Sequence, residues 1–539
     1  MESKAQTLNI KLYTAVCGIV SYSAIAFSGV LTLFSLISST FVNSFDQVYY
    51  IGDNALIHAL VIMAALFIVW VIHDKLHFRV TDRVLLISLI LMTVLTGVYI
   101  AAADLPPRFD QRVVRSIAAD LIVGIPDDFL PGAYGAMYPN NHGIILFYYL
   151  LMKLAGYENY IAMQYANLVF MVLTETAFYC ILKRLVPFYR EASLGLILFM
   201  PYWGFSTFLY GNIPGFCLCM WGFCFALRFL DGFKPTDAAL AGLLTGLGCR
   251  FKENMIIFVI AVSILIISES LKTGRWKSLF LIVSMLIFIL AGRLATDSAF
   301  KRLADYEPES GMPGSAFIAM GMHEQEYRGA GWFDNYTVDT FAEAGHDTRA
   351  ASEIAKEDIR TSVHNFLAHP TYLAGFYIRK AASTWNEPTY YSWPLQQGRK
   401  GEWDKSFFLP DTALVFAVFN RFQTLLYFFT LFYFIRHRKD TDLRILIFAV
   451  FFIGGFLFHL LWEAGSQYAL FYAMTLTIYA IGGIREACLF FKSLDKKKKT
   501  CAAILALCTG LILSVPGLSS ALTLSRDNSR FAEYMSEPY

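Results

Sequence analysis

The chain has 539 residues, of which 56% are hydrophobic and 16% charged, and its mean hydropathy is +0.50. A soluble protein of this length needs far less apolar surface, so we predict an all-α polytopic membrane protein. The formal net charge of +2 excludes nucleic acid as the main partner, because binding a phosphate backbone requires a concentrated basic surface.

Apolar runs of a length that suits helices crossing a bilayer follow one another along most of the chain. The runs are residues 12–39, 57–73, 83–103, 160–182, 191–209, 213–230, 236–250, 255–270, 278–297, 412–435, 442–461, 466–484 and 501–520. We therefore predict about 13 transmembrane helices. The first run is too long for the core of a signal peptide and lacks a small-residue cleavage site, so we expect it to be retained.

Basic residues gather in alternate connections between these runs, as in residues 74–83, 271–277 and 436–444. The positive-inside rule makes that side cytoplasmic, in a plasma (cytoplasmic) membrane, with the N-terminus inside and the C-terminus outside. The run from Lys496 to Lys499 is then a cytoplasmic topology anchor, and binding of anionic lipid head groups is its alternative role.

This orientation divides the chain into four parts. They are an N-terminal transmembrane module over 1–297 with an outer loop at 104–159, an extracytoplasmic domain over 298–411, C-terminal transmembrane helices over 412–520, and an outer tail over 521–539. Residues 347–368 and 371–385 are helical in pattern and are separated at His369-Pro370. We expect a small, mainly helical outer domain.

Two short segments of the outer loop are predicted to lie along the membrane surface. Residues 112–124 place their apolar side chains on one helical stripe, and residues 142–156 are apolar but too short to span. Both segments are therefore predicted as juxtamembrane helices.

Asp110 stands between Arg108 and Arg112, where the third apolar run leaves the membrane. The simple interpretation is a helix N-cap whose carboxylate accepts backbone N–H bonds. The functional interpretation is a carboxylate that faces a cavity at the membrane interface, where it takes a proton from an attacking hydroxyl or binds a metal ion.

The pattern of this loop resembles a known family. Pro106 to Asp110 form P-x-x-x-D, a short helix follows, and Y-P-N-N at 138–141 precedes a second short helix. Together with YGNIPG at 210–215, GLLTGLGCRFKEN at 242–254 and HLLWEAGSQY at 459–468, this is similar to the C-superfamily (GT-C) integral-membrane glycosyltransferases, especially bacterial, Gram-positive members. Gln467 stands where that family usually has Arg.

The resemblance implies an inverting enzyme that moves a sugar from a polyprenyl-phosphate donor to a glycan, lipid or protein acceptor of the cell envelope, on the outer membrane face. Asp110 would be the catalytic carboxylate. Some relatives require a divalent cation such as Mg or Mn, for which Asp110 and His142 are candidate ligands.

Other residues suit the two substrates by their chemistry. Arg250 and Lys252 lie in a break between two runs and suit the lipid phosphate, although cations also snorkel at helix ends. Arg112 and Arg115, with Arg108, compete for this role, or pair with Asp104, Asp120 or lipid head groups. Candidate sugar-binding residues are Tyr134, Tyr138, Asn140, Asn141, His142, Glu463 and Tyr468.

Three alternatives are left open. A transporter or flippase of lipid-linked sugars would show repeated halves and charged residues in mid-span. A glycan polymerase or ligase would use a late outer loop, where His364, His369 and Arg379 lie. A metal site could form from His323, Glu324, Glu326 and Asp334, but these lack a tight ligand spacing, so a solvated loop is favoured.

Overall fold

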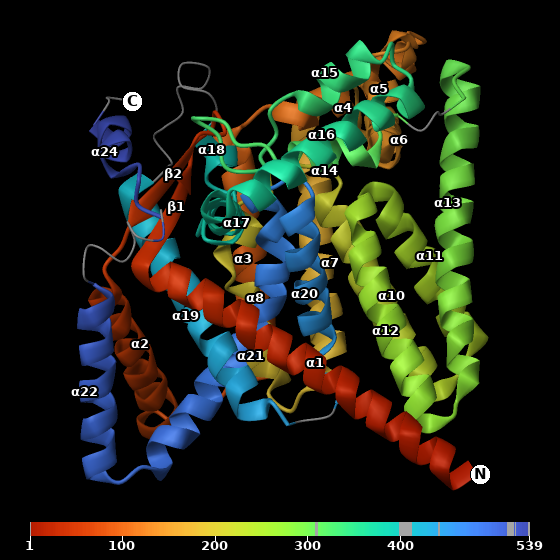
Figure 1. The fold of residues 1–539 in the computed structure, drawn as a ribbon. Helices are drawn as coiled ribbons and strands as arrows, with labels where there is room; N and C mark the ends of the chain where they lie inside the picture. Colours follow the sequence, from red (N-terminus) through yellow and green to blue (C-terminus); the bar gives the residue numbers. More distant parts are fainter. Residues whose placement is uncertain are drawn as a thin grey trace.

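The computed structural model describes residues 2–307, 311–397, 412–439, 442–514, 522 and 524–536. Long helices stand side by side, and shorter helices cover one end of them (Figure 1). Within the described residues, nine helices are long and apolar enough to cross a membrane. The chain is therefore a multi-pass membrane protein.

These nine helices correspond to nine of the predicted apolar runs. They are α1 (Glu2–Ile37), α2 (Ala55–Trp70), α3 (Asp82–Ala103), α7 (Tyr160–Leu185), α10 (Asn212–Gly232), α12 (Ile256–Thr273), α13 (Phe280–Ala304), α19 (Thr412–His437) and α21 (Ser466–Ser493).

The other four predicted runs form shorter or less apolar helices. They are α8 (Tyr189–Ile197) with α9 (Met200–Trp203), α11 (Pro235–Phe251), α20 (Ile447–Leu461) and α22 (Lys496–Leu513). The run over 191–209 is broken near Pro201, and α22 begins with the lysines that lower its hydropathy. The last six residues of the run over 501–520 lie outside the described residues. The count of about 13 spans stays a prediction.

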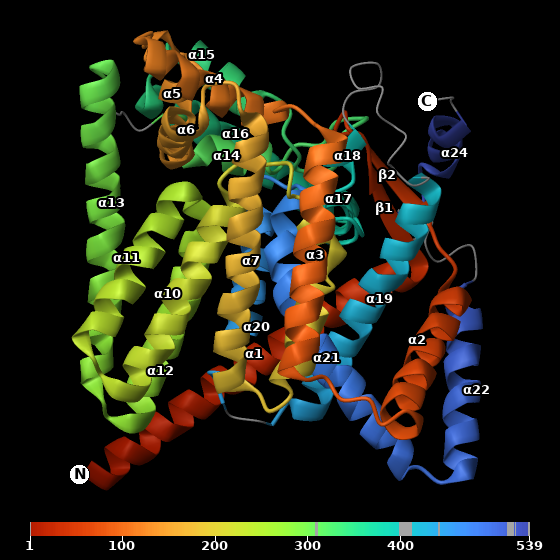
Figure 2. The same ribbon diagram turned by 180° about the vertical axis from the view of Figure 1, so that it is seen from behind.

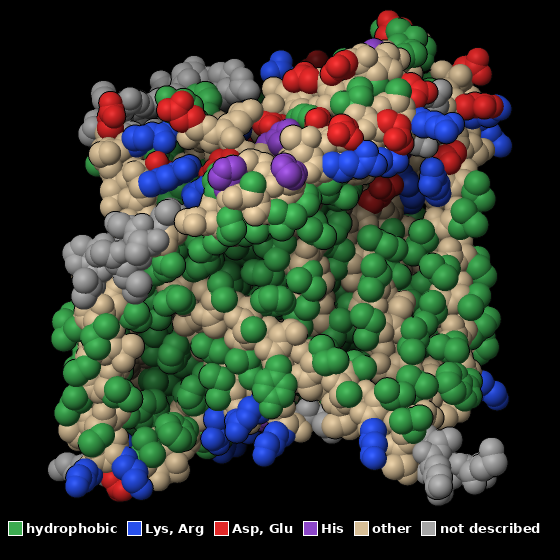
Figure 3. Space-filling view, in the orientation of Figure 1, with side chains coloured by type: hydrophobic (Ala, Val, Ile, Leu, Met, Phe, Trp, Pro, Cys, Tyr) green, Lys and Arg blue, Asp and Glu red, His purple; other side chains and the backbone are tan. Residues whose placement is uncertain are grey.

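The surface has an apolar middle and two charged ends (Figure 3). Lys and Arg side chains dominate the end at which α1 begins, whereas acidic, basic and histidine side chains mix at the other end. The last described helix, α24 (Asn528–Ser536), lies at that mixed end. We call the mixed end the outer end, following the predicted orientation, which itself stays a prediction.

Both short helices of the outer loop are present at this end as α4 (Phe109–Val123) and α6 (His142–Ala155). They pack on each other through their apolar stripes, and Val114, Ile117 and Tyr148 are fully buried there. The 3.6-residue spacing of the apolar positions explains why both segments are helices with one buried face. Between them lie α5 (Tyr134–Met137) and two short 3-10 turns, Asp127–Phe129 and Pro139–Asn141.

Beyond α13, the described part of the segment 298–411 consists of helices joined by loops. It contains α14 (Gly314–Met320), α15 (Tyr336–Glu343), α16 (Thr348–Ala368), α17 (Pro370–Trp385) and α18 (Pro394–Gln397). The predicted helix break at His369-Pro370 is confirmed, because Pro370 is the first residue of α17. Trp385 packs on Phe452 and Tyr472 of α20 and α21, so this segment is anchored among the long helices.

The fold is predominantly helical, as predicted, and its exception among the described residues is a small β-hairpin. Strands β1 (Ser38–Val42) and β2 (Val48–Gly52) pair antiparallel, with Val42 opposite Val48. Their β-branched and aromatic residues favour extended backbone, and the Asn43 carboxamide accepts N–H bonds from Phe45 and Gln47 to close the turn. Asp527, just before α24, accepts the N–H of Tyr50 at 3.2 Å, so the outer tail is docked on this hairpin.

Candidate active site

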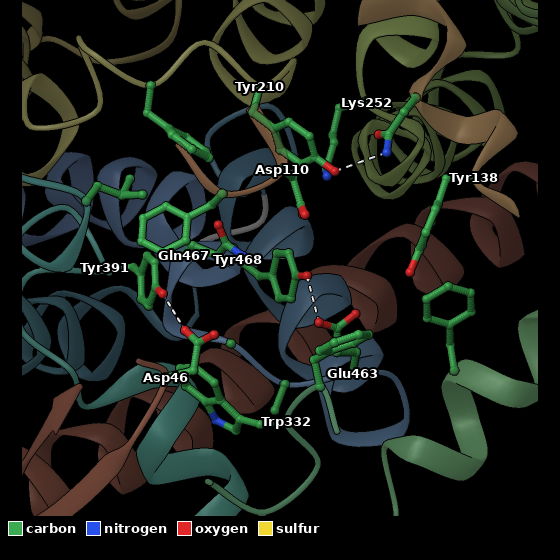
Figure 4. Close-up of a pocket in the computed structure, with 18 of the residues that line it drawn as sticks. Asp46, Asp110, Tyr138, Tyr210, Lys252, Trp332, Tyr391, Glu463, Gln467 and Tyr468 are labelled. Atoms are coloured by element: carbon green, nitrogen blue, oxygen red, sulfur yellow. Dashed lines mark hydrogen bonds between the residues drawn. The ribbon is translucent and has the colours of Figure 1, made fainter. Parts of the chain in front are cut away.

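A cavity of about 400 Å³ lies at the outer end, between the outer helices and the ends of the long ones (Figure 4). Its walls come from the hairpin turn, the start of α4, the loop before α6, the break between α11 and α12, the outer segment and the loop before α21. The lining residues are Asp46, Phe109, Asp110, Tyr138, Asn140, Asn141, Phe208, Tyr210, Lys252, Phe317, Arg328, Trp332, Phe333, Tyr391, Leu395, Glu463, Ala464, Gly465, Gln467 and Tyr468.

Asp110 points into this cavity from the first turn of α4 (Figure 4). The N-cap position belongs to Arg108, and no side chain caps the helix, so the N-cap interpretation of Asp110 is wrong. Phe109, between them, has φ of 50°, a left-handed conformation that a non-glycine residue adopts only when its surroundings impose it.

Arg108 supplies much of that constraint. Its buried guanidinium donates to the Leu395 carbonyl at 2.5 Å, and to the Thr207 Oγ1 at 2.7 Å and carbonyl at 3.3 Å. These bonds clamp the start of α4 against two distant segments. Arg108 is therefore a structural residue that aims Asp110, and its donors bind neutral oxygens rather than an acid.

The charge of Asp110 favours the protonated form of Lys252, and the charge of Lys252 favours the ionised form of Asp110. Burial raises the pKa of Asp110, while a hydrogen bond from Tyr210 and the charge of Lys252 lower it and the charge of Asp46 raises it. Burial lowers the pKa of Lys252, and the charges of Asp110 and Glu463 raise it. Asp110 is exposed on the cavity, so a ligand bound there can reach its carboxylate.

Glycines place Lys252 beside Tyr210. Gly211, with φ of +83°, lies so close to the end of α11 that a Cβ atom would stand 2.3 Å from the Phe251 carbonyl oxygen. A Cβ on Gly143 of α6 would stand 2.0 Å from the Arg250 carbonyl oxygen. Because both backbones approach this closely, the Lys252 Nζ comes to 4.9 Å from the centre of the Tyr210 ring.

A hydrogen-bonded trio supports Tyr210 from behind. The hydroxyls of Tyr134 and Tyr210 are 3.0 Å apart, and the Asn141 carboxamide donates to both at 3.0 Å. The rings of Tyr134 and Tyr138 are 4.5 Å apart. Tyr138, Asn140 and Asn141 line the cavity, whereas Tyr134 lies one layer behind, and their role in sugar binding stays a prediction.

The loop before α21 contributes a second acid. The Tyr468 hydroxyl donates to the Glu463 carboxylate at 3.0 Å, and His459 stacks on the Tyr468 ring at 5.1 Å. Burial raises the pKa of Glu463 to about 7, against the lowering effects of the Tyr468 hydrogen bond and the charge of Lys252. Glu463, Gln467 and Tyr468 all face the cavity that Asp110 faces (Figure 4).

The cavity wall opposite Asp110 contains Asp46, Trp332 and Tyr391, which were not predicted from the sequence. Asp46, at the hairpin turn, accepts a hydrogen bond from Tyr391, which follows α17. Trp332 is fixed beside Glu463 by a short parallel bridge, in which the Ala464 N–H donates to the Gly331 carbonyl at 2.7 Å. Asp46 shares one sequence signal with Asp110, an acid just after a span on the outer side. No local signal identifies Trp332 or Tyr391.

Several predicted site residues lie outside the cavity lining. The guanidinium of Arg250 donates to the Pro139 carbonyl at 3.2 Å and pairs with Glu253 at 3.5 Å, so it fastens the outer loop. Arg112 and Arg115 line a different hollow. His142 is buried with its Nε2 atom 2.8 Å from the Gly135 carbonyl oxygen, and burial lowers its pKa to about 4. These placements give none of the four a direct contact with a ligand beside Asp110.

Neither of the metal sites considered from the sequence has a preformed set of ligands among the described residues. Among the described residues, no three His, Cys, Asp or Glu side chains are grouped so that they could hold an ion. In the outer segment His323 pairs with Asp334 at 3.0 Å, and Glu324 pairs with Arg379 at 2.6 Å. The arrangement of the described residues around Asp110 therefore does not fit a resident cation.

Comparison with protein-family models, with curated proteins and with solved structures finds no match to this chain. Function is therefore inferred from the cavity and its position at the outer end of the apolar helices.

Proposed function

We propose that this protein is an inverting glycosyltransferase that moves a sugar from a polyprenyl-phosphate donor to a cell-envelope acceptor at the outer membrane face. The observation that carries the proposal is the presence of Asp110 and Lys252 in one cavity with aromatic walls, next to the ends of the apolar helices, where the charge of each favours the charged form of the other. A lipid-borne donor requires its reacting groups at that depth.

Asp110 and Lys252 have different roles in the proposed transfer reaction. Asp110 accepts the proton of an acceptor hydroxyl as its oxygen attacks the anomeric carbon, and the bond from that carbon to the phosphate oxygen breaks. Attack from the face opposite the leaving group inverts the anomeric carbon. Lys252 faces the negative charge that develops on the departing lipid phosphate, and its position beside Asp110 is set before the reaction begins.

The remaining walls suit a carbohydrate. The rings of Tyr138, Trp332 and Tyr391 offer flat apolar faces for sugar C–H groups, and Asn140 and Gln467 offer amides for hydroxyl groups. A volume of about 400 Å³ lies in the range of pockets that hold small ligands.

The alternative function is transport of a lipid-linked sugar. Glu175, which is buried in the middle of α7, is the observation that favours it, since ionisable groups in mid-span commonly serve transport. A polymerase or ligase centred on the late outer loop has less support. Arg379 is paired with Glu324, His369 is exposed and bonded to the Asn365 carbonyl oxygen, and neither lines the cavity.

Transfer can be tested with purified protein in lipid nanodiscs and a panel of labelled polyprenyl-phosphate sugars. We expect polyprenyl phosphate to be released only when an acceptor is present, and Asp110→Asn to slow release by about 10²–10⁴-fold. Asp120→Asn is the matched control, because Asp120 lies on the same helix but does not line the cavity.

Full turnover by Asp110→Asn would refute the proposed role of Asp110. Movement of the intact donor across a vesicle membrane, without cleavage, would establish the transport alternative.

A further inference from the structure

A second hollow, also of about 400 Å³, lies on the other side of the start of α4. It is lined by Pro106, Pro107, Arg112, Arg115, Glu158 and Tyr160. None of these residues lines the Asp110 cavity, so the two spaces have separate walls.

The hollow lies where the apolar faces of two spans end. Pro106 and Pro107 follow α3, and Tyr160 begins α7, which stands next to α3 (Figure 2). Below it, Val98 of α3 is 60% exposed and Val169 of α7 is 57% exposed, as expected for side chains that face lipid tails. The hollow is therefore at the height where lipid head groups meet the protein.

The two arginines have most of their hydrogen-bonding capacity unused. The exposed side chain of Arg112 makes no hydrogen bond or ion pair with any other residue that the structure describes. Arg115 donates once, to the Tyr157 carbonyl at 3.0 Å, and its buried Nε has no partner within the described part of the chain. A buried guanidinium N–H without an acceptor is costly, so an acceptor from outside the chain is expected.

The spacing of the two arginines and the net positive charge of the hollow indicate the chemistry of that acceptor. Arg112 and Arg115 are three residues apart on α4 and project to the same side of the helix. Their planar forks match phosphate oxygens, and they outnumber the single carboxylate, Glu158. The volume is on the order of ten times the ~30 Å³ share of a water molecule, which is room for a phosphate and its substituents.

We propose that this hollow binds the phosphate of a membrane lipid through Arg112 and Arg115. The proposal does not rest on the glycosyltransferase function. Such a phosphate has two sources, the diester of a phospholipid head group and the monoester of a polyprenyl phosphate, and the same experiment separates them.

Native mass spectrometry of the full chain, released from detergent micelles, can count bound lipids. The probes are phosphatidylethanolamine, phosphatidylglycerol, a short-chain polyprenyl phosphate and inorganic phosphate, each titrated alone. We expect the wild type to retain a phosphate lipid and Arg112→Gln with Arg115→Gln to weaken that retention by about tenfold or more, because two charge-assisted contacts are lost. The tighter of the lipid probes identifies the natural source.

Two control variants keep the result interpretable. Arg349→Gln with Arg360→Gln removes the same charge from exposed positions of α16 that line neither cavity, and should retain the lipid. Arg112→Lys with Arg115→Lys keeps the charge and the fold but loses the planar forks, and should bind with intermediate affinity.

Equal lipid retention by the wild type and the double Gln variant would overturn the proposal. So would binding of inorganic phosphate as tight as that of every lipid. Retention of the two phospholipid probes by Asp110→Asn is expected to be unchanged, which separates this site from the proposed active site.

Discussion

Asp110 is exposed on the cavity and Lys252 is half-buried, and the charge of each favours the charged form of the other. Removing one of them takes that favourable interaction away from the other. Tyr210 contacts both, through a hydrogen bond to Asp110 and a ring beneath the Lys252 ammonium group. The three side chains therefore act as one unit, and a change at one of them is expected to alter the ionisation of the next.

Lys252→Met should shift the pH dependence of transfer. The charge of Lys252 lowers the pKa of Asp110, so its loss raises that pKa. Because the base must be ionised, the acidic limb of the plot of kcat/KM against pH is expected to move to higher pH, in addition to a fall in rate. Lys252→Arg keeps the charge and should leave the limb in place. An unmoved limb in Lys252→Met would contradict the coupling.

Glu463→Gln tests the second acid through stability. The folded-state pKa of Glu463 is about 7, above its ordinary value of 4.5. The wild type therefore gains protons on folding between those values and loses stability as pH rises from about 4.5 to about 7. We expect Tm of Glu463→Gln to equal that of the wild type near pH 4.5 and to exceed it at pH 8. A difference independent of pH would rule out the raised pKa.

At the scale of elements, the outer end is assembled by close backbone contacts. The loop before α10 and the start of α6 both touch the end of α11, and glycine is the residue that permits this approach. The hairpin carries Asp46 of the opposite wall in its turn, while its strands pair with each other and Tyr50 of β2 donates its N–H to Asp527 of the outer tail. The lining residues are thus held by elements whose own contacts lie outside the cavity.

Gly211→Ala is expected to damage both stability and transfer. Its Cβ would meet the Phe251 carbonyl oxygen, and its φ of +83° strains any other residue, so a cost of about 1–3 kcal/mol is expected. Displacement of Lys252 would lower kcat as well. Gly232→Ala is the control, because nothing lies within 4 Å of its added Cβ. Thermal unfolding and transfer assays of both variants provide the measurement, and equal effects would argue against the close-contact model.

At the scale of the whole molecule, charge distribution predicts how the chain sits in the membrane. Basic side chains collect at the end where α1 begins, and the two candidate ligand sites lie at the other end (Figure 3). A donor with a lipid tail and a water-soluble acceptor would meet at that outer end.

Cysteine labelling can test this orientation. All nine native cysteines lie in or beside the apolar runs predicted to span, so the wild type should react little with a membrane-impermeant maleimide in intact cells. Glu343→Cys, at the exposed end of α15, should be labelled in intact cells, whereas Lys277→Cys, exposed before α13, should be labelled only after permeabilisation. The opposite pattern would invert the predicted topology and place the cavity in the cytoplasm.

The sequence by itself determined the membrane class, the position of the apolar helices and the two amphipathic outer helices. Hydropathy and the 3.6-residue spacing of apolar side chains can both be read from neighbouring residues in the chain. Each pattern is directly related to whether a helix is stable within a bilayer or at its surface. Asp110, Lys252, Glu463 and Tyr468 were identified as candidates for a related reason, since polar groups at the end of an apolar run are costly unless they are used or paired.

Only the tertiary structure decided which of these side chains share a cavity. It brought Asp46, Trp332 and Tyr391 to Asp110 from segments far apart in the chain. It also turned Arg112 and Arg115 away to another hollow, although they lie only a few residues from Asp110. Neighbours on a helix point in different directions, and a cavity forms where distant backbones approach each other. Sequence spacing alone does not encode that approach, which here depends on glycine contacts and on a strained Phe109.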